Sequence, residues 1–105
     1  MIIPRARSRT AEFAAAVAEV ERQLVPDVVR IRFTLGEDWT GDPAVFFKIV
    51  VPDDVFTSGR ISPVSLRISQ AITLTVEPLE EWGVMPYFNY RSESGQAKMN
   101  EPAWA

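Results

Sequence analysis

The 105-residue chain contains no cysteine and no histidine. The absence of cysteine excludes disulfides, thiolate zinc sites and cysteine nucleophiles. The absence of histidine excludes a Ser-His-Asp triad and a histidine general base, and it removes a frequent ligand of transition metals. No phosphate-binding glycine loop or nucleophile-elbow motif is present either. We therefore expect a non-catalytic protein that uses no cofactor.

Long hydrophobic runs are also missing from the chain. No stretch approaches the roughly 18 apolar residues that a membrane-spanning helix needs. The opening residues MIIPRARSRT have neither the apolar core nor the cleavage site of a signal peptide. These absences predict a cytoplasmic protein with no membrane association. The frequent arginine and alanine residues are compatible with a bacterial source of high GC content.

The charge balance is acidic, with a net charge of −3 at pH 7. Apolar residues make up 47% of the chain and charged residues 24%, which is the balance of one ordinary globular domain. An acidic chain is repelled by nucleic acid as a whole. The charge is uneven, however, because residues 1–35 contain six arginines and only four acidic residues. A local basic patch is therefore still compatible with the sequence.

Residues 28–51 have the pattern of a β-hairpin. In the first strand, apolar and polar residues alternate, so that one face is apolar and the other basic. The apolar face consists of Val29, Ile31, Phe33 and Leu35, and the second strand continues it with Val45, Phe47, Ile49 and Val51. A third strand is predicted over residues 84–91, where Pro86 favours a position at the edge of a sheet.

Two helices are predicted from apolar residues at helical spacing. The first covers residues 10–25 and ends before Pro26, because the residue that precedes a proline avoids the helical conformation. The second begins with Ser62 and Pro63 as N-cap and first helical residue. Pro78 ends or kinks this helix near Val76, and a further turn precedes Gly83.

The predicted order of elements is α-β-β-α-β, which favours a two-layer α+β sandwich with both helices on the apolar face of the sheet. The third strand can lie parallel to the second through a right-handed crossover, or beside the first strand. We predict the latter, a mainly antiparallel sheet with strand order 2-1-3. Residues 1–94 then form a single domain, and residues 95–105 form a C-terminal docking tail. The open edges of such a sheet favour self-association.

An acidic loop, residues 36–43, joins the first two strands. Glu37, Asp38 and Asp42 are possible ligands of Mg²⁺ or Ca²⁺, but the spacing of an EF-hand is absent. We therefore expect a turn-forming loop rather than a metal site. Trp39 either folds back onto the core or serves as an anchor for a partner, and we expect it to fold back.

Two functions fit these patterns. The first is a protein-binding module that acts as a homodimer or as the small subunit of a hetero-complex, with an antitoxin-like or accessory role. Its anchors would be Trp39, Met99 and Trp104. The alternative is RNA or nucleic-acid binding, because basic and aromatic side chains share the second face of the sheet. This face would consist of Arg30, Arg32, Phe46, Lys48 and Arg91.

Overall fold

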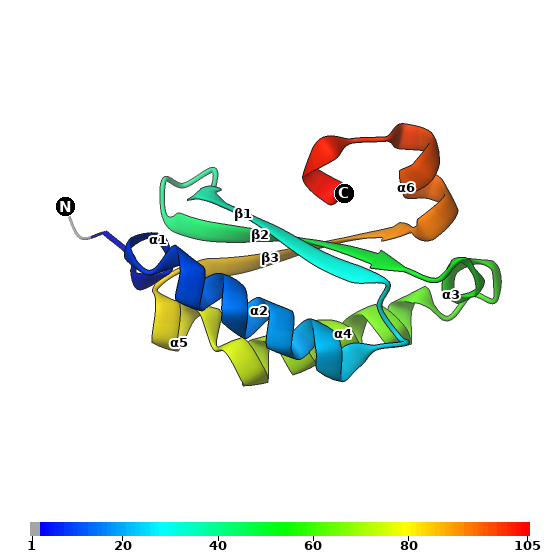
Figure 1. Cartoon of the computed structure of the whole chain (residues 1–105), viewed down its shortest axis with the longest axis horizontal. Helices are drawn as coiled ribbons and strands as arrows, with labels where there is room; N and C mark the ends of the chain where they lie inside the picture. The colour runs from blue at the N-terminus through cyan, green and yellow to red at the C-terminus, as the bar shows by residue number, and fades with distance from the viewer. Residues whose placement is uncertain (1–2) are drawn as a thin grey trace.

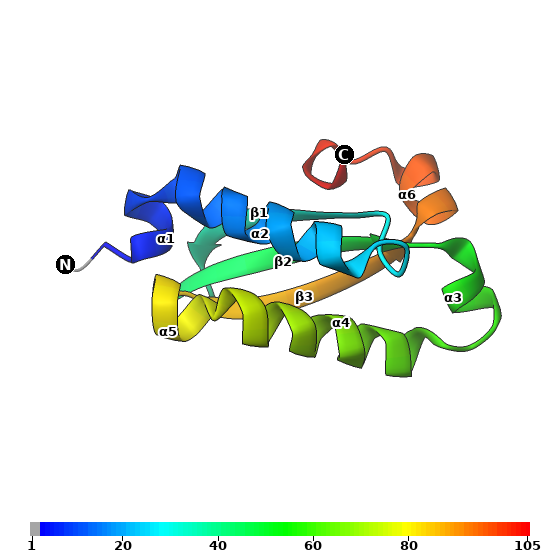
Figure 2. The same ribbon diagram turned by 60° about the horizontal axis from the view of Figure 1, so that its bottom comes forward.

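Helices α2 and α4 cover one face of a three-stranded sheet, and the C-terminal segment lies over the other face (Figures 1 and 2). The computed structural model describes residues 3–105. Its elements are α1 (Arg5–Ser8), α2 (Thr10–Leu24), β1 (Arg30–Glu37), β2 (Pro43–Val51), α3 (Asp53–Thr57), α4 (Ile61–Val76), α5 (Pro78–Trp82), β3 (Met85–Ser92), α6 (Glu93–Met99) and the 3-10 turn η1 (Pro102–Trp104). The predicted α+β class with two helices on the apolar face is confirmed.

The sheet has the strand order β1-β2-β3, so the predicted order 2-1-3 is wrong. β1 and β2 are antiparallel, whereas β2 and β3 are parallel, so the sheet is mixed and the prediction of a mainly antiparallel sheet is also wrong. The reason lies in β2, which buries Val45, Phe47 and Ile49 under the helices and also buries Val50 on the opposite face. A strand that is buried on both faces belongs in the centre of a sheet. The connection through α4 then provides the crossover that a parallel neighbour requires.

The core lies between the sheet and helices α2 and α4. Phe33, Phe47 and Phe88 are paired neighbours across the three strands. The ring of Phe13 from α2 packs edge-on against Phe33, with 4.9 Å between the ring centroids. The apolar spacing of both helices is confirmed by their buried residues. These are Phe13, Val17 and Val20 in α2 and Val64, Ile68, Ile72 and Val76 in α4.

Prolines in the sequence indicate where α2 ends but not where α4 begins. α2 ends at Leu24, and Val25 is extended before Pro26, as expected. α4 begins at Ile61, so the prediction of Ser62 as its N-cap is wrong. Pro63 falls in the first turn of α4, where a backbone N–H has no partner within the helix. A proline is therefore tolerated there and does not fix the first residue.

The C-terminal residues, which the sequence predicts to form a docking tail, contain a short helix and a 3-10 turn. Ser92 caps α6 by accepting a hydrogen bond from the N–H of Gly95, and η1 follows. The expected boundary after residue 94 falls inside α6. Figure 1 shows that α6 and η1 lie on the sheet face opposite α2 and α4. Within residues 3–105, no helix has the length and apolar character that crossing a membrane requires.

Candidate interaction surface

The loop between β1 and β2 is organised by Asp38. Its carboxylate accepts hydrogen bonds from the hydroxyl and the N–H of Thr40, at 2.6 and 2.9 Å, and from the N–H of Asp42 at 3.0 Å. The hydroxyl of Tyr87 in β3 also donates to Asp38, at 2.9 Å. The Thr40 hydroxyl makes the largest contribution to lowering the pKa of Asp38, from 3.8 to about 2. The loop is therefore held together internally and tied to the sheet.

Trp39 lies at the tip of this loop and does not fold back onto the core as expected. Its side chain is 90% exposed. The hydrogen bonds around Asp38 fix the backbone on both sides of Trp39, so the indole is presented to solvent on an ordered loop. We call residues 38–42 the Trp39 loop. The Asp-x-Thr spacing at its start is typical of turns in which a side chain accepts hydrogen bonds from the backbone, and it was the available sequence signal for this arrangement.

The acidic residues of the loop do not gather into a cation site. Within residues 3–105, no group of three or more acidic side chains is placed to hold a metal ion. Asp38 is occupied by donors from Thr40, Asp42 and Tyr87. The carboxylate of Asp42 shares the single proton of the Thr40 hydroxyl with Asp38, at the longer distance of 3.1 Å. These two carboxylates therefore serve the structure of the loop.

Trp104, the last of the expected anchors, packs within its own chain. Its side chain is only 5% exposed. The guanidinium carbon of Arg91 lies 4.1 Å from the centroid of the indole ring, which is the geometry of a cation–π contact. Arg30 Nε donates to the Trp104 carbonyl oxygen at 2.8 Å. The C-terminal segment therefore docks on the sheet of the same molecule, and Trp104 is not an exposed anchor.

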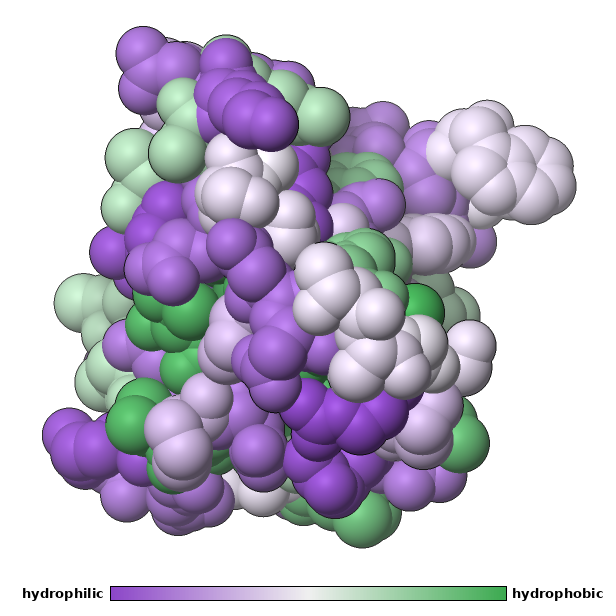
Figure 3. Space-filling model, turned by 90° about the vertical axis from the view of Figure 1, so that its right-hand side faces the viewer, coloured by the Kyte–Doolittle hydropathy of each residue, from purple (hydrophilic) through white to green (hydrophobic). Residues whose placement is uncertain are grey.

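Met99 remains open to solvent. It ends α6, and its side chain is 58% exposed. Viewed from the end where α3 and α6 lie, the surface shows small apolar areas separated by hydrophilic ones (Figure 3). Met99 is therefore exposed at the end of a short helix, whereas Trp39 lies on a loop that hydrogen bonds hold in place.

The five residues of the expected nucleic-acid face do lie on the outer side of the sheet, but its arginines are already engaged. Arg91 donates to Gln96 and Glu101, and Arg32 donates to Glu21 and to the carbonyl of Ala105. Lys48 Nζ donates to the Thr34 hydroxyl at 2.8 Å, and partial burial lowers its pKa. The ring of Phe46 stacks on Tyr87, with 5.4 Å between centroids. Phosphate binding would have to displace these contacts.

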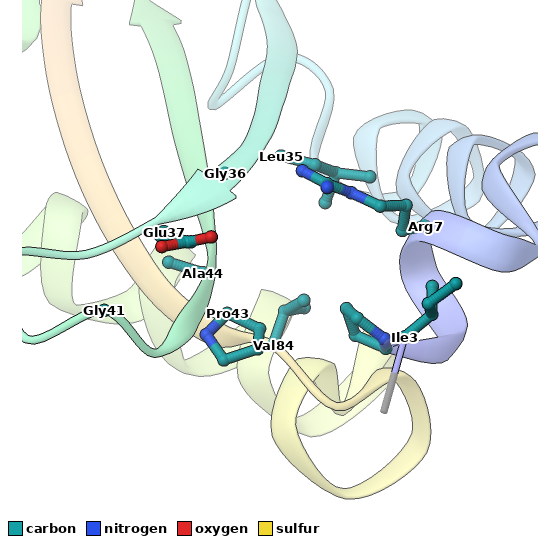
Figure 4. Close-up of a pocket in the computed structure, with 10 residues that line it drawn as sticks. Ile3, Arg7, Leu35, Gly36, Glu37, Gly41, Pro43, Ala44 and Val84 are labelled. Carbon is teal, nitrogen blue, oxygen red and sulfur yellow. The ribbon is translucent and has the colours of Figure 1, made fainter. Parts of the chain in front are cut away.

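A small pocket borders the Trp39 loop (Figure 4). Its volume is about 240 Å³, and its wall is largely apolar, with Ile3, Leu35 and Val84 among the lining residues. The side chains of Arg7 and Glu37 lie on opposite sides of the opening. Glu37 precedes the Trp39 loop and Gly41 belongs to it. Residues from α1, β1 and β2 line the pocket together with Val84, which precedes β3, so no local sequence motif indicates it.

Comparison with known proteins found no matching family model, no matching curated protein and no matching solved structure. Function therefore has to be inferred from the surfaces of this chain. The Trp39 loop and the pocket beside it form the most specific of these surfaces. They combine an exposed aromatic side chain, a rigid support and an apolar recess.

Proposed function

We propose that this chain is a small, non-catalytic protein-binding module that holds a protein partner through the Trp39 loop. It would act as a homodimer or as the small subunit of a hetero-complex, with an antitoxin-like or accessory role. The observation that carries this proposal is the 90% exposed indole of Trp39 on a loop braced by Asp38. The chain would act on its partner either by serving as a scaffold for it or by covering its functional surface.

An exposed tryptophan on an ordered loop suits an anchor for two reasons. Tryptophan is enriched among the residues that dominate binding energy at protein interfaces. A loop that is already ordered loses little conformational freedom when it binds, so less of the contact energy is lost to ordering. The hydrogen bonds of Asp38 to Thr40, Asp42 and Tyr87 provide that order.

The adjacent pocket supports the same proposal. A side chain of the partner could enter this apolar recess of about 240 Å³ while the indole of Trp39 packs against the partner surface. Arg7 and Glu37 flank the opening with opposite charges. They suit a partner segment that carries both signs of charge, or backbone groups that need a donor and an acceptor.

RNA binding is the alternative function, and the contacts of the outer sheet face weigh against it. Arg30, Arg32 and Arg91 all donate to the C-terminal segment. The net charge of −3 adds a general repulsion from phosphate. RNA binding would need the C-terminal segment to leave the sheet, which would expose Trp104.

The test is affinity purification of the tagged protein from its own host, with identification of bound proteins and sequencing of bound nucleic acid. Trp39→Ala is compared with Leu79→Ala, which removes an exposed apolar side chain from α5. We expect a stoichiometric protein with the wild type and with Leu79→Ala. We expect Trp39→Ala to weaken its binding about 30-fold, as loss of a binding hot spot does.

Two results would contradict the proposal. Equal recovery of the same protein by Trp39→Ala would show that the Trp39 loop is not the anchor. Enrichment of RNA without a protein partner would favour the outer sheet face instead. In that case, Arg30→Glu should abolish RNA binding, whereas Trp39→Ala should leave it unchanged.

A further inference from the structure

The outward side of α4 is almost free of charge. Arg67 is the only charged residue in this helix, and it pairs with Asp27 at 3.0 Å. Leu66 is 59% exposed and Leu74 is 78% exposed. The other exposed residues of α4 are Ser62, Pro63, Gln70, Thr73 and Thr75. Solvent-exposed helices usually carry many charges, whereas the centres of protein interfaces are depleted of them.

The outer edge of β3 is open. β3 pairs with β2 alone. Within the part of the chain from residue 3 to 105, no hydrogen bond from outside the sheet reaches the β3 backbone between Met85 and Arg91. Edge strands are normally protected by lysines, prolines, inward charges or bulges. β3 has Pro86 near its start, so the stretch open to pairing is Tyr87–Arg91. The only charged side chain of β3 is Arg91, and it is engaged by Gln96 and Glu101.

The open strand and the uncharged helix lie next to each other. The hydroxyl of Tyr90 in β3 donates to the carbonyl of Ser65 in α4 at 2.9 Å, and it also contacts the hydroxyl of Ser69. Figure 2 shows α4 running along β3. We call the exposed residues of α4 together with the outer edge of β3 the α4/β3 side.

We propose that a second copy of this chain docks on the α4/β3 side, so that the two β3 strands pair antiparallel about a two-fold axis and the two α4 helices pack against each other. This inference assigns a surface to the homodimer of the proposed function. It uses the outer edge of β3 and the exposed side of α4, whereas the Trp39 loop contacts β3 through the side chain of Tyr87. A strand edge is complementary to itself when paired antiparallel, because each copy offers the same alternating N–H and C=O groups.

Charge is the reason for choosing a second copy over another protein. Each copy carries a net charge of −3, so two copies repel each other where their acidic residues meet. The α4/β3 side avoids this repulsion, because Arg67 and Arg91 are its charged residues and both are already paired. A strongly charged partner would find no complementary charge there.

The lengths of α4 and β3 also fit this arrangement. The 16 residues of α4 and the eight residues of β3 are about 24 and 27 Å long, so each element can meet its copy along its whole length.

The test is the mass of the protein in solution, measured by light scattering over a range of concentrations. We expect the wild type to reach twice the 11.8 kDa mass of one chain. The double variant Leu66→Glu/Thr73→Glu places two carboxylates on the α4/β3 side and should weaken the dimer at least about tenfold. Ala11→Glu/Ala18→Glu is the matched control, with the same spacing and charge change on exposed positions of α2, and it should remain dimeric.

Three results would overturn the inference: a monomeric wild type at every concentration, a dimer that persists in Leu66→Glu/Thr73→Glu, or a dimer lost equally in the control. Trp39→Ala should stay dimeric, which separates this inference from the proposed function. If Leu66→Glu/Thr73→Glu does not fold, the lack of cysteine allows a second test. Gln70→Cys should be linked to its copy by a short bismaleimide while Ala15→Cys is not, and linkage in neither or in both would equally overturn the inference.

Discussion

The two long sides of the molecule have the same architecture but different surface chemistry. On one side, α2 runs beside the edge strand β1, and on the other, α4 runs beside the edge strand β3. The exposed residues of α2 include Glu12, Glu19 and Arg22, whereas α4 contains a single charged residue. Glu21 of α2 accepts a hydrogen bond from the N–H of Ile31 in β1 at 2.6 Å, and β3 receives no such bond from α4 within residues 3–105.

This difference shows that a neighbouring helix does not by itself close the edge of a sheet. Near its start, β1 is covered by particular side chains and by the C-terminal segment. Glu21 occupies the N–H of Ile31, while Arg30 and Arg32 hold the carbonyls of Trp104 and Ala105. α4 places Ser65 and Ser69 beside Tyr90 of β3, and within residues 3–105 no side chain of α4 bonds to the backbone at the outer edge of the strand. The α2/β1 side is therefore partly closed, whereas the α4/β3 side is open.

The largest expected effect comes from removing the C-terminal cover. Trp104→Ala leaves a cavity over the sheet and exposes the guanidinium of Arg91, so it should lower the free energy of unfolding by about 3 kcal/mol. Urea denaturation measures this change. Met99→Ala is the control, because its exposed side chain should contribute less than about 0.5 kcal/mol. Equal effects of the two substitutions would show that the tail does not cover the sheet in solution.

A smaller effect should follow from opening the edge of β1. Glu21→Ala leaves the N–H of Ile31 without its carboxylate acceptor, at a cost of about 1–2 kcal/mol in unfolding free energy. Hydrogen exchange at Ile31 should become faster. Glu19→Ala removes an exposed carboxylate of the same helix that pairs with Arg22, and it should cost less than about 0.5 kcal/mol. Unchanged exchange at Ile31 would mean that Glu21 does not close the edge.

The stability of the protein should depend on pH through Asp38 in the Trp39 loop. Because the pKa of Asp38 falls from 3.8 to about 2 on folding, its ionised form stabilises the fold above about pH 4. This contribution should be lost as the pH drops from 4 towards 2. Asp38→Asn should therefore have a flatter stability curve than the wild type in this range. An NMR titration that gives Asp38 an ordinary pKa would contradict the bracing of the Trp39 loop.

The smallest effect is expected for the only charge on α4. Arg67→Gln removes an exposed ion pair with Asp27, which should change the unfolding free energy by less than about 0.5 kcal/mol. It leaves α4 without any charge, so association of two copies should be at least as tight as in the wild type. A weaker dimer would show that Arg67 itself takes part in the contact.

The parts of the fold that depend on local pattern could be predicted from the sequence. The alternation of Ile31, Phe33 and Leu35 predicts the buried face of β1, and all three pack in or against the core. Pro26 and Pro78 correctly indicate where α2 and α4 end. These predictions are correct because strand alternation and the effect of proline depend only on the backbone geometry of a single strand or helix.

The arrangement of the third strand could not be predicted from such local patterns. The choice between β1 and β2 as its neighbour depends on the burial of Val50 beneath the C-terminal segment. The sequence predicts a docking tail over residues 95–105 but does not indicate the surface on which it docks. In the structure, Gln96 and Glu101 both bind Arg91, which also covers Trp104. The site depends equally on distant contacts, since Tyr87 braces a loop that ends some 45 residues earlier.

Hydrogen exchange of the wild-type backbone at two protein concentrations, about tenfold apart, tests the difference between the two sides most directly. We expect amides of β3 and α4 to exchange more slowly at the higher concentration, whereas those of β1 and α2 should not change. Slower exchange in β1 at the higher concentration, or no change in β3, would contradict the assignment of β3 as the open edge.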